Sequence, residues 1–212
     1  MKIGIIGAGG IGQLYARLWS ARGHDVMLSS RNPDKIIDAA AAVGAKTGTA
    51  ATAAAFGDVV VLAVNYWTVD QAIDAITPHI EGKLIIDTTN PLQYNANGGV
   101  ERVIAEDELA AAIMMAKLPA ARIAKAFTTL WTGHVEKHSD VDAPTTAMPY
   151  AADDDVDRQT VAGLISDAGL VPVDLGTIAQ SRLLDPPSPI WNVVLSADEL
   201  RARASKSVRG NR

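Results

Sequence analysis

Residues 2–12 read KIGIIGAGGIG, a short apolar run followed at once by a glycine-rich turn. Ile3, Ile5 and Ile6 predict a buried strand, and the segment 7–12 matches the pattern G-x-G-x-x-G. Apolar residues then recur with helical spacing from Ile11 to Trp19, as in a helix that packs on a sheet. The glycines therefore lie between a strand and a helix, which is the context that a dinucleotide-binding turn requires.

Each glycine of this turn has a physical use in such a site. Gly7 permits the tight turn, Gly9 lets the backbone approach a pyrophosphate, and Gly12 lets the helix pack close to the strand. The start of the helix offers N–H groups and a positive dipole end to the phosphates. The alternative interpretation is a glycine-rich turn that binds no ligand.

The composition is that of a globular protein with one sizeable core. The chain has 212 residues, of which 48% are hydrophobic and 20% charged, and its net charge of −5 gives no indication of a nucleic-acid partner. It contains no cysteine, which excludes disulfides, thiolate metal sites and a cysteine nucleophile. The first predicted strand begins at residue 2, and no apolar run approaches the roughly 18 residues of a membrane span. We therefore expect a cytoplasmic protein with no signal peptide and no membrane segment. The sequence does not distinguish a monomer from a homodimer.

The end of the second predicted strand indicates which dinucleotide binds. An NAD enzyme places an acidic residue about 20 positions after the glycines, where it accepts from the ribose hydroxyls. This chain has Ser30 and Arg31 there, followed by Lys35 in the first turn of the next predicted helix. Arginine pairs with a 2′-phosphate and a serine hydroxyl donates to it, so the sequence predicts NADP as cofactor. The alternative is that Arg31 and Lys35 are solvated surface charges.

Strands and helices alternate along the chain, which predicts an α/β fold with a doubly wound, mostly parallel sheet. We expect a Rossmann dinucleotide-binding domain over residues 1–150. A smaller part over 151–212, with a small C-terminal helical segment, is expected to pack on it and help close the acceptor site. Further predictions are a strand over 121–127, a mostly helical stretch over 101–118, a polar loop over 133–144, and a solvated or partly disordered basic tail over 201–212.

Ligands of doubly wound sheets bind beyond the carboxyl ends of the strands. The later ends predicted here are the segments 63–67, 90–92 and 127–130, which we expect to surround the nicotinamide and its reaction partner. Asn90 precedes Pro91, which holds an amide at a strand exit. The alternative for Asn90 is a turn residue that bonds its own backbone.

Two polar clusters could hold a metal, and we predict no metal site at either. His134 and His138 would share a helix face with Glu136 between them, but the spacing is not H-E-x-x-H. The run Asp153-Asp154-Asp155 could hold a hard cation, yet it is better explained as the solvated start of a helix.

Several stretches together resemble one family, the NADP-dependent reductases of the 8-hydroxy-5-deazaflavin coenzyme F420. They are the glycine turn, SSRNPDK at 29–35, DVVVLAV at 58–64, KLIIDTTNPL at 83–92, ARIAKAF at 121–127, and the late AADDD, LISDAGLVPVDLG and SRLLDP stretches. The family commonly reads KAFNT where this chain has KAFTT. The resemblance implies that a hydride passes between NADPH and a deazaflavin that lie in one cleft.

The resemblance also implies roles for individual residues. The residues implied to bind cofactor are Gly7, Ala8, Gly9, Gly10 and Ile11 at the pyrophosphate, Ser30, Arg31 and Lys35 at the 2′-phosphate, and Ala63, Val64, Asn65 and Asn90 near the nicotinamide. The strand-exit rule and the resemblance together predict a flat, largely apolar slot for the acceptor, with Trp67, Pro91, Leu92, Thr128 and Leu130 as substrate-binding residues.

We predict an NADP-dependent oxidoreductase with a deazaflavin or flavin acceptor and no catalytic side chain, because the two cofactors carry the chemistry of hydride transfer. One alternative is a dehydrogenase or imine reductase of a small metabolite, which would need a proton donor and a cation for a carboxylate. Lys125 and Arg182 are the cations available for that purpose. The other alternative is a non-catalytic module that senses NADP.

Overall fold

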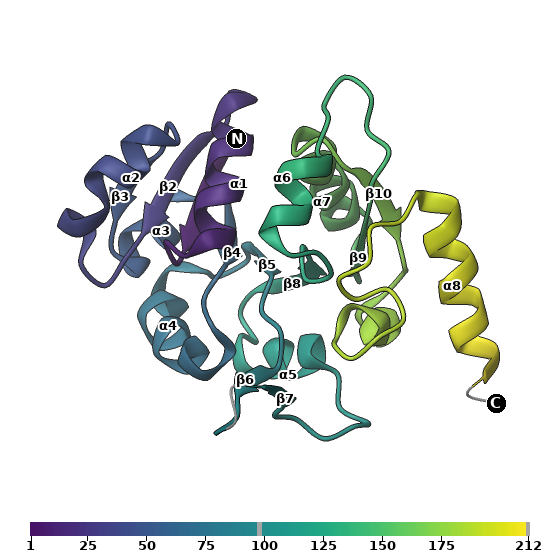
Figure 1. Ribbon diagram of the computed structural model, residues 1–212. Helices are drawn as coiled ribbons and strands as arrows, with labels where there is room; N and C mark the ends of the chain where they lie inside the picture. The colour runs from purple at the N-terminus through teal and green to yellow at the C-terminus, as the bar shows by residue number, and fades with distance from the viewer. Residues whose placement is uncertain (97–98, 211–212) are drawn as a thin grey trace. The chain divides into compact units, whose positions relative to one another are not determined.

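The computed structural model describes residues 1–96 and 99–210 (Figure 1). By contact, the chain groups into two compact units. Unit 1 comprises residues 1–89 and 113–123, and unit 2 comprises residues 90–112 and those from 124 onward. This division differs from the boundary predicted at residue 150, and the strand that ends at Ala126 pairs with a later strand of the chain.

Unit 1 is built on five parallel strands in the order β3-β2-β1-β4-β5. Their bounds are β1 Lys2–Ile6, β2 Asp25–Ser29, β3 Lys46–Gly48, β4 Val59–Leu62 and β5 Leu84–Asp87. The chain proceeds outward from β1 in both directions, so the order reverses between β1 and β4. This is the doubly wound parallel arrangement that the sequence predicts, and it puts the carboxyl ends of all five strands at one edge.

Helices cover both faces of this sheet. They are α1 Gly10–Ala21, α2 Ile37–Ala42, α3 Ala50–Phe56 and α4 Val69–Ile76, with short 3₁₀ helices at Pro33–Ile36, Tyr66–Thr68 and Thr77–His79. A side chain at Gly12 of α1 would touch Leu28, whereas one at Gly4 of β1 would lie 2.0 Å from the Ala53 carbonyl oxygen of α3. Gly4 and Ile5 face opposite sides of β1, and Ile5 lies beside Leu28, so α1 and α3 pack on opposite faces.

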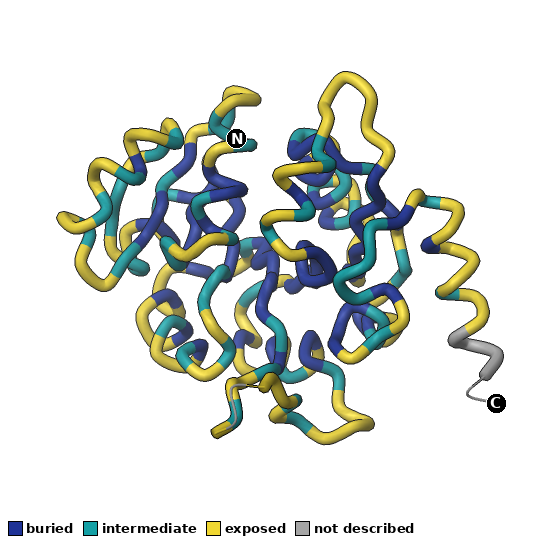
Figure 2. The backbone as a smooth tube through the Cα atoms, in the orientation of Figure 1, coloured by how far each residue is buried: buried dark blue, intermediate teal, exposed yellow. Residues whose placement is uncertain are grey.

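The core of unit 1 lies under α3 and α4. One buried cluster joins the sheet to apolar residues of these two helices. Its sheet members include Ile6, Val60, Leu62 and Ile85, and Met114 and Leu118 also belong to it. Figure 2 shows the sheet strands buried and the outer turns of the helices exposed. On the other face, Tyr15 and Trp19 of α1 are buried and stack with ring centroids 5.2 Å apart. Burial raises the pKa of the Tyr15 phenol far above its ordinary value.

Besides a separate two-stranded hairpin, unit 2 contains strands in the order β8-β9-β10, of which β8 and β9 are antiparallel and β9 and β10 parallel. Its elements are the hairpin of β6 Leu92–Tyr94 and β7 Val100–Arg102, then β8 Arg122–Ala126, α6 Thr132–His138, β9 Ala147–Ala152, α7 Asp155–Asp167, β10 Val171–Asp174, the 3₁₀ helix η4 Ile178–Leu184 and α8 Ala197–Gly210. The helix α5 Ala110–Lys117 runs from unit 2 into unit 1. A second apolar cluster, with Val173, Ile190 and Leu200 among its members, joins β9, β10 and α8.

Two local predictions for this part of the chain are wrong. The stretch predicted as mostly helical over 101–118 is helical only in α5, because its first residues pair as β7 with β6. The predicted loop over 133–144 contains most of α6. The predicted solvated tail over 201–212 is helical as far as residue 210, and its side chains over 201–206 are mostly exposed; residues 211–212 lie outside the described ranges. Within the described ranges, no helix combines the length and apolar character that a bilayer span requires.

Candidate functional site

The exits of β1 and β4 lie against each other in unit 1. The Ala63 amide donates to the Ile6 carbonyl over 2.9 Å, so the chain leaving β4 continues beside the end of β1. Gly7 has a φ of 114°, and a side chain there would lie 2.5 Å from the Ala63 carbonyl oxygen. The turn after β1 therefore accepts only glycine at this position, for both conformational and steric reasons.

The start of α1 presents an open surface at Gly9. A Cβ atom on Gly12 would lie 2.0 Å from the Gly7 carbonyl oxygen, so Gly12 closes the turn against the helix. A Cβ on Gly9 would meet no atom within 4 Å. Gly9 is the N-cap of α1 and provides no side chain to the first N–H groups, and its carbonyl accepts from the Gln13 amide at 2.9 Å. Free N–H groups beside an open backbone surface suit a pyrophosphate group.

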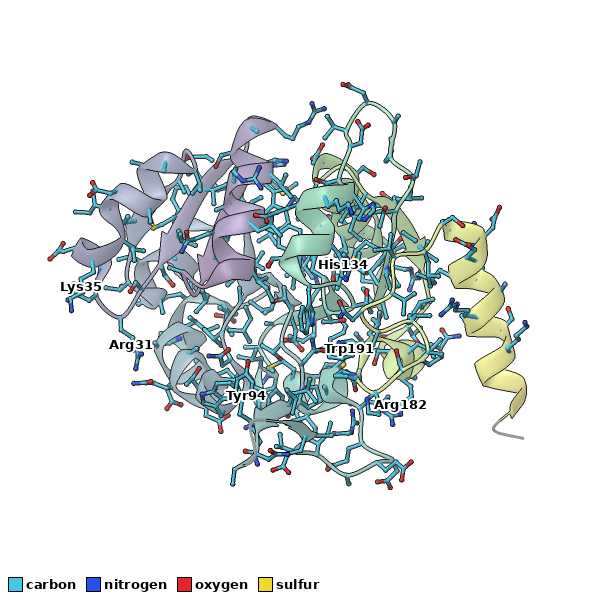
Figure 3. The ribbon with its side chains drawn as sticks, in the orientation of Figure 1. Arg31, Lys35, Tyr94, His134, Arg182 and Trp191 are labelled. Carbon is cyan, nitrogen blue, oxygen red and sulfur yellow. The ribbon has the colours of Figure 1, made fainter. Side chains whose placement is uncertain are left out.

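Two cations without partners follow the exit of β2. Arg31 and Lys35, both labelled in Figure 3, are exposed. In the part of the chain that the structure describes, neither side chain forms a hydrogen bond or an ion pair. Ser30 accepts from the Asn32 amide at 3.2 Å through its hydroxyl oxygen, which leaves the hydroxyl proton available to a ligand. It is Ser29, not Ser30, that contacts the glycine turn, through a 3.2 Å hydrogen bond from the Gly7 amide. An anion near this exit would meet two cationic side chains that form no ion pair within the described residues.

The segment after β4 presents both polar and aromatic groups. Asn65 is exposed, and its carbonyl accepts from the Thr68 hydroxyl at 3.0 Å, which closes the short 3₁₀ helix that carries Trp67. Trp67 is 53% exposed. Val64 lies close to the glycine turn, because a Cβ on Gly7 would be 3.1 Å from its Cγ1.

In unit 2, Asn90 and Thr128 join two strand exits to the end of η4. The Asn90 Nδ2 donates to the Thr128 carbonyl over 2.9 Å, and the Thr128 hydroxyl donates to the Leu184 carbonyl over 2.9 Å. The Asn90 amide therefore bonds a distant backbone group, which argues against the alternative of a turn residue that bonds only its own backbone. Its Oδ1 atom is buried and has no hydrogen-bond partner among the described residues. Pro91 is buried and Leu92 half-buried at the start of the hairpin.

The loop after β8 is buried except at its last residue. Thr128, Thr129 and Leu130 are 4%, 2% and 6% exposed, whereas Trp131 is 63% exposed. The exposed apolar side chain of this segment is thus Trp131, which the sequence analysis did not single out. An aromatic residue next to a predicted strand exit is the signal that could have identified it.

The two cations considered for a small acid substrate both belong to unit 2. The Lys125 side chain lies within β8, opposite Ala151 of β9, and is fully buried. Arg182 is half-buried in η4, and its Nη1 atom has no hydrogen-bond partner in the described ranges. In Figure 3, Arg182 lies well apart from His134 of the same unit.

The acidic run at the start of α7 is structural. Asp154 caps the helix by accepting from the Val156 and Asp157 amides at 2.8 and 3.2 Å. Asp153 accepts from the Ile178 amide at 2.9 Å, and Asp155 pairs with Arg158.

The histidine pair lies on one helix. The rings of His134 and His138, one turn apart on α6, have centroids separated by 6.5 Å. A search of the described residues finds no group of three or more potential ligands that could hold a metal ion.

Comparison with known proteins shows what this chain is similar to. Residues 2–91 match the model of the family described as NADP oxidoreductase, coenzyme F420-dependent. Over these residues the chain is similar to NADP-dependent oxidoreductases. The resemblance that the motifs indicate is confirmed, as are the predictions of an NADP-dependent oxidoreductase and of NADP as its cofactor.

Individual relatives extend the similarity over most of the chain. An F420-dependent NADP reductase of Methanothermobacter thermautotrophicus is 26% identical over 205 residues, which cover 90% of this chain and 87% of the relative. The structure of a hypothetical protein from Sinorhizobium meliloti is 25% identical with a TM-score of 0.81, covering 92% of this chain and 95% of that one. A putative F420-dependent NADP reductase from an Arthrobacter species is 22% identical with a TM-score of 0.75, covering 86% and 87% of the two chains.

More distant structures share the fold alone. They include imine reductases and a 3-hydroxyisobutyrate dehydrogenase at 14–18% identity, and this chain covers only 56–61% of their lengths. The fold class predicted from the sequence, an α/β arrangement with mostly parallel strands, is confirmed.

Proposed function

We propose that the protein transfers a hydride between NADP(H) and a deazaflavin or flavin-type acceptor. The observation that carries this proposal is the extent of the similarity to the F420-dependent NADP reductase, which spans 90% of the chain and so includes unit 2 as well as unit 1. A dinucleotide-binding motif alone would support only the NADP half, because many enzymes share that motif.

The NADP half is supported by three features of unit 1. The open surface at Gly9, beside the first turn of α1, has room for a pyrophosphate, and we assign that contact to the segment 7–11. Ser30, Arg31 and Lys35 provide a hydroxyl and two unpaired cations for the 2′-phosphate. The segment 63–65 adjoins the glycine turn at the point where the strand order reverses, and we assign it to the nicotinamide end of the cofactor.

In unit 2, we assign ligand contacts to Asn90, Pro91, Leu92, Thr128 and Leu130. NADPH supplies the hydride, so the protein has only to bind and orient the two rings and to exclude water. Asn90 suits this purpose because its Nδ2 is held by the Thr128 carbonyl, while its Oδ1 atom can accept a hydrogen bond from a ligand N–H group. No side chain is needed as a catalytic acid or base, and we assign none.

The test is NADPH oxidation by the purified protein with four mixtures: a deazaflavin, flavin mononucleotide, ferric citrate, and no acceptor. We expect the loss of NADPH absorbance to require an acceptor and to be fastest with the deazaflavin. The Gly9→Val variant is the matched control, because it should fold but not bind NADPH. If a folded protein that binds NADP reduces none of the three acceptors, the proposal is refuted.

A dehydrogenase or imine reductase of a small metabolite is the second candidate, and one observation favours it. The unpaired Nη1 of Arg182 could hold a substrate carboxylate. In that case turnover would occur with small keto acids or imines and would fall in the Arg182→Ala variant, whereas the three acceptors above would not react. Binding of NADP without turnover of any substrate would instead indicate a sensing module.

A further inference from the structure

Two residues other than glycine have a left-handed backbone in the part of the chain that the structure describes. They are Phe127, with a φ of 60°, and Asn192, with a φ of 56°. Asparagine tolerates this conformation, but a bulky aromatic residue rarely adopts it. Such residues persist only where the surroundings fix them, and they gather at functional sites.

These two residues lie at the same loop of unit 2, although they are far apart in sequence. Phe127 directly follows the last residue of β8 and precedes the buried loop 128–130. The Asn192 amide donates to the Thr129 carbonyl of that loop over 2.6 Å. The Asn192 Oδ1 also accepts from the Trp131 amide at 3.4 Å. Asn192 therefore bonds the loop twice, once through its backbone and once through its side chain.

The opposite side of the loop is held by the Asn90 network. Thr128 accepts from Asn90 through its carbonyl and donates to Leu184 through its hydroxyl. Three segments distant in sequence thus fix residues 128–131, and each uses a different hydrogen bond.

This arrangement determines how the loop meets the start of α6. Trp131 is the N-cap of α6, and its carbonyl accepts from the His134 and Val135 amides at 3.0 and 3.2 Å. Trp131 is also the exposed aromatic side chain of the loop. A shift of the loop at Thr129 would therefore move both the backbone beside Asn90 and the indole of Trp131.

We propose that Asn192 is a positioning residue for the acceptor, which holds the loop 128–131 in the one conformation that the acceptor ring contacts. The inference rests on the proposed function, because it takes the exit of β8 as an acceptor-binding segment. Asn192 satisfies two requirements at once: it adopts the left-handed conformation that aims its amide at Thr129, and its side chain reaches Trp131. Glycine meets only the first requirement and alanine meets neither.

The experiment compares Asn192→Gly and Asn192→Ala with the unmutated protein in NADPH oxidation by the best acceptor. We expect Asn192→Ala to raise the KM for the acceptor by about ten-fold or more, the equivalent of at least one lost hydrogen bond. Asn192→Gly should raise it less, because it loses only the contact to Trp131. The Kd for NADPH should stay within about two-fold in both variants, since affinity depends on contacts that they leave intact.

A structural control separates positioning from general loss of stability. Asp154→Ala removes the N-cap of α7, also in unit 2, and should lower the melting temperature without changing the KM for the acceptor. Amide hydrogen exchange provides a second readout: the amides of residues 129–135 should exchange faster in Asn192→Ala than in Asp154→Ala.

The outcomes are distinct. If Asn192→Ala lowers the melting temperature as Asp154→Ala does and leaves the acceptor KM unchanged, Asn192 has only a structural role and the inference is overturned. If the unmutated protein reduces no acceptor, the proposed function fails first and the inference fails with it, and that failure is visible without any variant. A rise in acceptor KM graded from Asn192→Gly to Asn192→Ala, with NADPH affinity retained, supports the positioning role.

Discussion

Removal of the Arg31 side chain should change which dinucleotide the protein binds. Arg31 and Lys35 follow the exit of β2 as two exposed cations, neither of which has a partner within the described residues. A 2′-phosphate at this exit would give both cations a counter-charge. NAD lacks this phosphate, so the substitution Arg31→Ala should weaken NADP binding and leave NAD binding nearly unchanged.

The size of the effect follows from the exposure of the two cations. A hydrogen bond to a charged group contributes about 1.5–3 kcal/mol, and solvent screening places an exposed contact at the lower end of that range. Since each 1.4 kcal/mol is a factor of ten, we expect about a ten-fold loss of NADP affinity for Arg31→Ala. The double variant with Lys35→Ala should lose more. Because the Debye length is about 8–10 Å near physiological ionic strength, the preference for NADP should decrease as salt is added.

Calorimetric titration of both dinucleotides at several salt concentrations measures these effects. Arg22→Ala is the matched control, because it removes the same charge from an exposed residue. Arg22 lies at the C-terminal end of α1, just before β2 begins, and so at the edge of the sheet opposite to the strand exits. It should change neither affinity. Equal affinity of the unmutated protein for NADP and NAD would refute the assignment, as would an equal loss of both in Arg31→Ala.

Three further predictions concern glycines of unit 1 and the last helix. Gly9→Val should abolish NADPH binding at little cost in melting temperature, because its Cβ meets no protein atom within 4 Å; retained binding by a folded variant would remove this loop from the site. Gly12→Ala should instead destabilise the fold by about 1–3 kcal/mol, since its Cβ would lie 2.0 Å from the Gly7 carbonyl oxygen; an unchanged melting curve would contradict this. The Ser196 amide and hydroxyl both donate to the Glu199 carboxylate, and the amide bond is the larger cause that lowers the pKa of Glu199 below its ordinary value. Because the pKa of Glu199 is lowered in the folded protein, its carboxylate stabilises α8 at pH values above the ordinary pKa of glutamate, and this stabilisation is lost as the pH falls through the folded pKa. We therefore expect α8 to fray in acid and Glu199→Gln to remove that pH dependence, as measured by amide exchange at several pH values.

Unit 1 was predictable because the determinants of its first turn are mostly local. The strand, the turn and the helix of residues 2–19 are consecutive, and a side chain at Gly12 would meet Gly7 of the same turn, whereas one at Gly7 would meet Ala63 at the neighbouring strand exit. The same holds for the residues at the end of β2, where Ser30 and Arg31 replace an expected carboxylate. What the sequence did not indicate is the use of Ser29, whose hydroxyl accepts from the Gly7 amide.

Unit 2 was less predictable because its elements depend on contacts between distant residues. The predicted long helix over 101–118 is interrupted by pairing in the β6–β7 hairpin, and Arg102 of that hairpin donates to the Pro186 carbonyl over 2.9 Å. The first residue of α5 is fixed by Asp185, which accepts from the Ala110 amide 75 residues away. The periodicity of the local sequence contains no information about such a contact, so the helix predicted over 101–118 was too long.

The dependence of unit 2 on contacts between distant residues also affects how acceptor preference can change among related chains. The loop 128–131 is held by hydrogen bonds that span 38, 56 and 61 residues, from Asn90, to Leu184 and to Asn192. A change in any one of these segments can move the loop without touching the glycine turn or the cations at the end of β2. Since residues 2–91 alone match the family model, the dinucleotide half of the chain carries the recognisable pattern. Under the role that we propose for Asn192, acceptor binding depends on residues that matter because distant segments meet there, and sequence motifs do not contain that information.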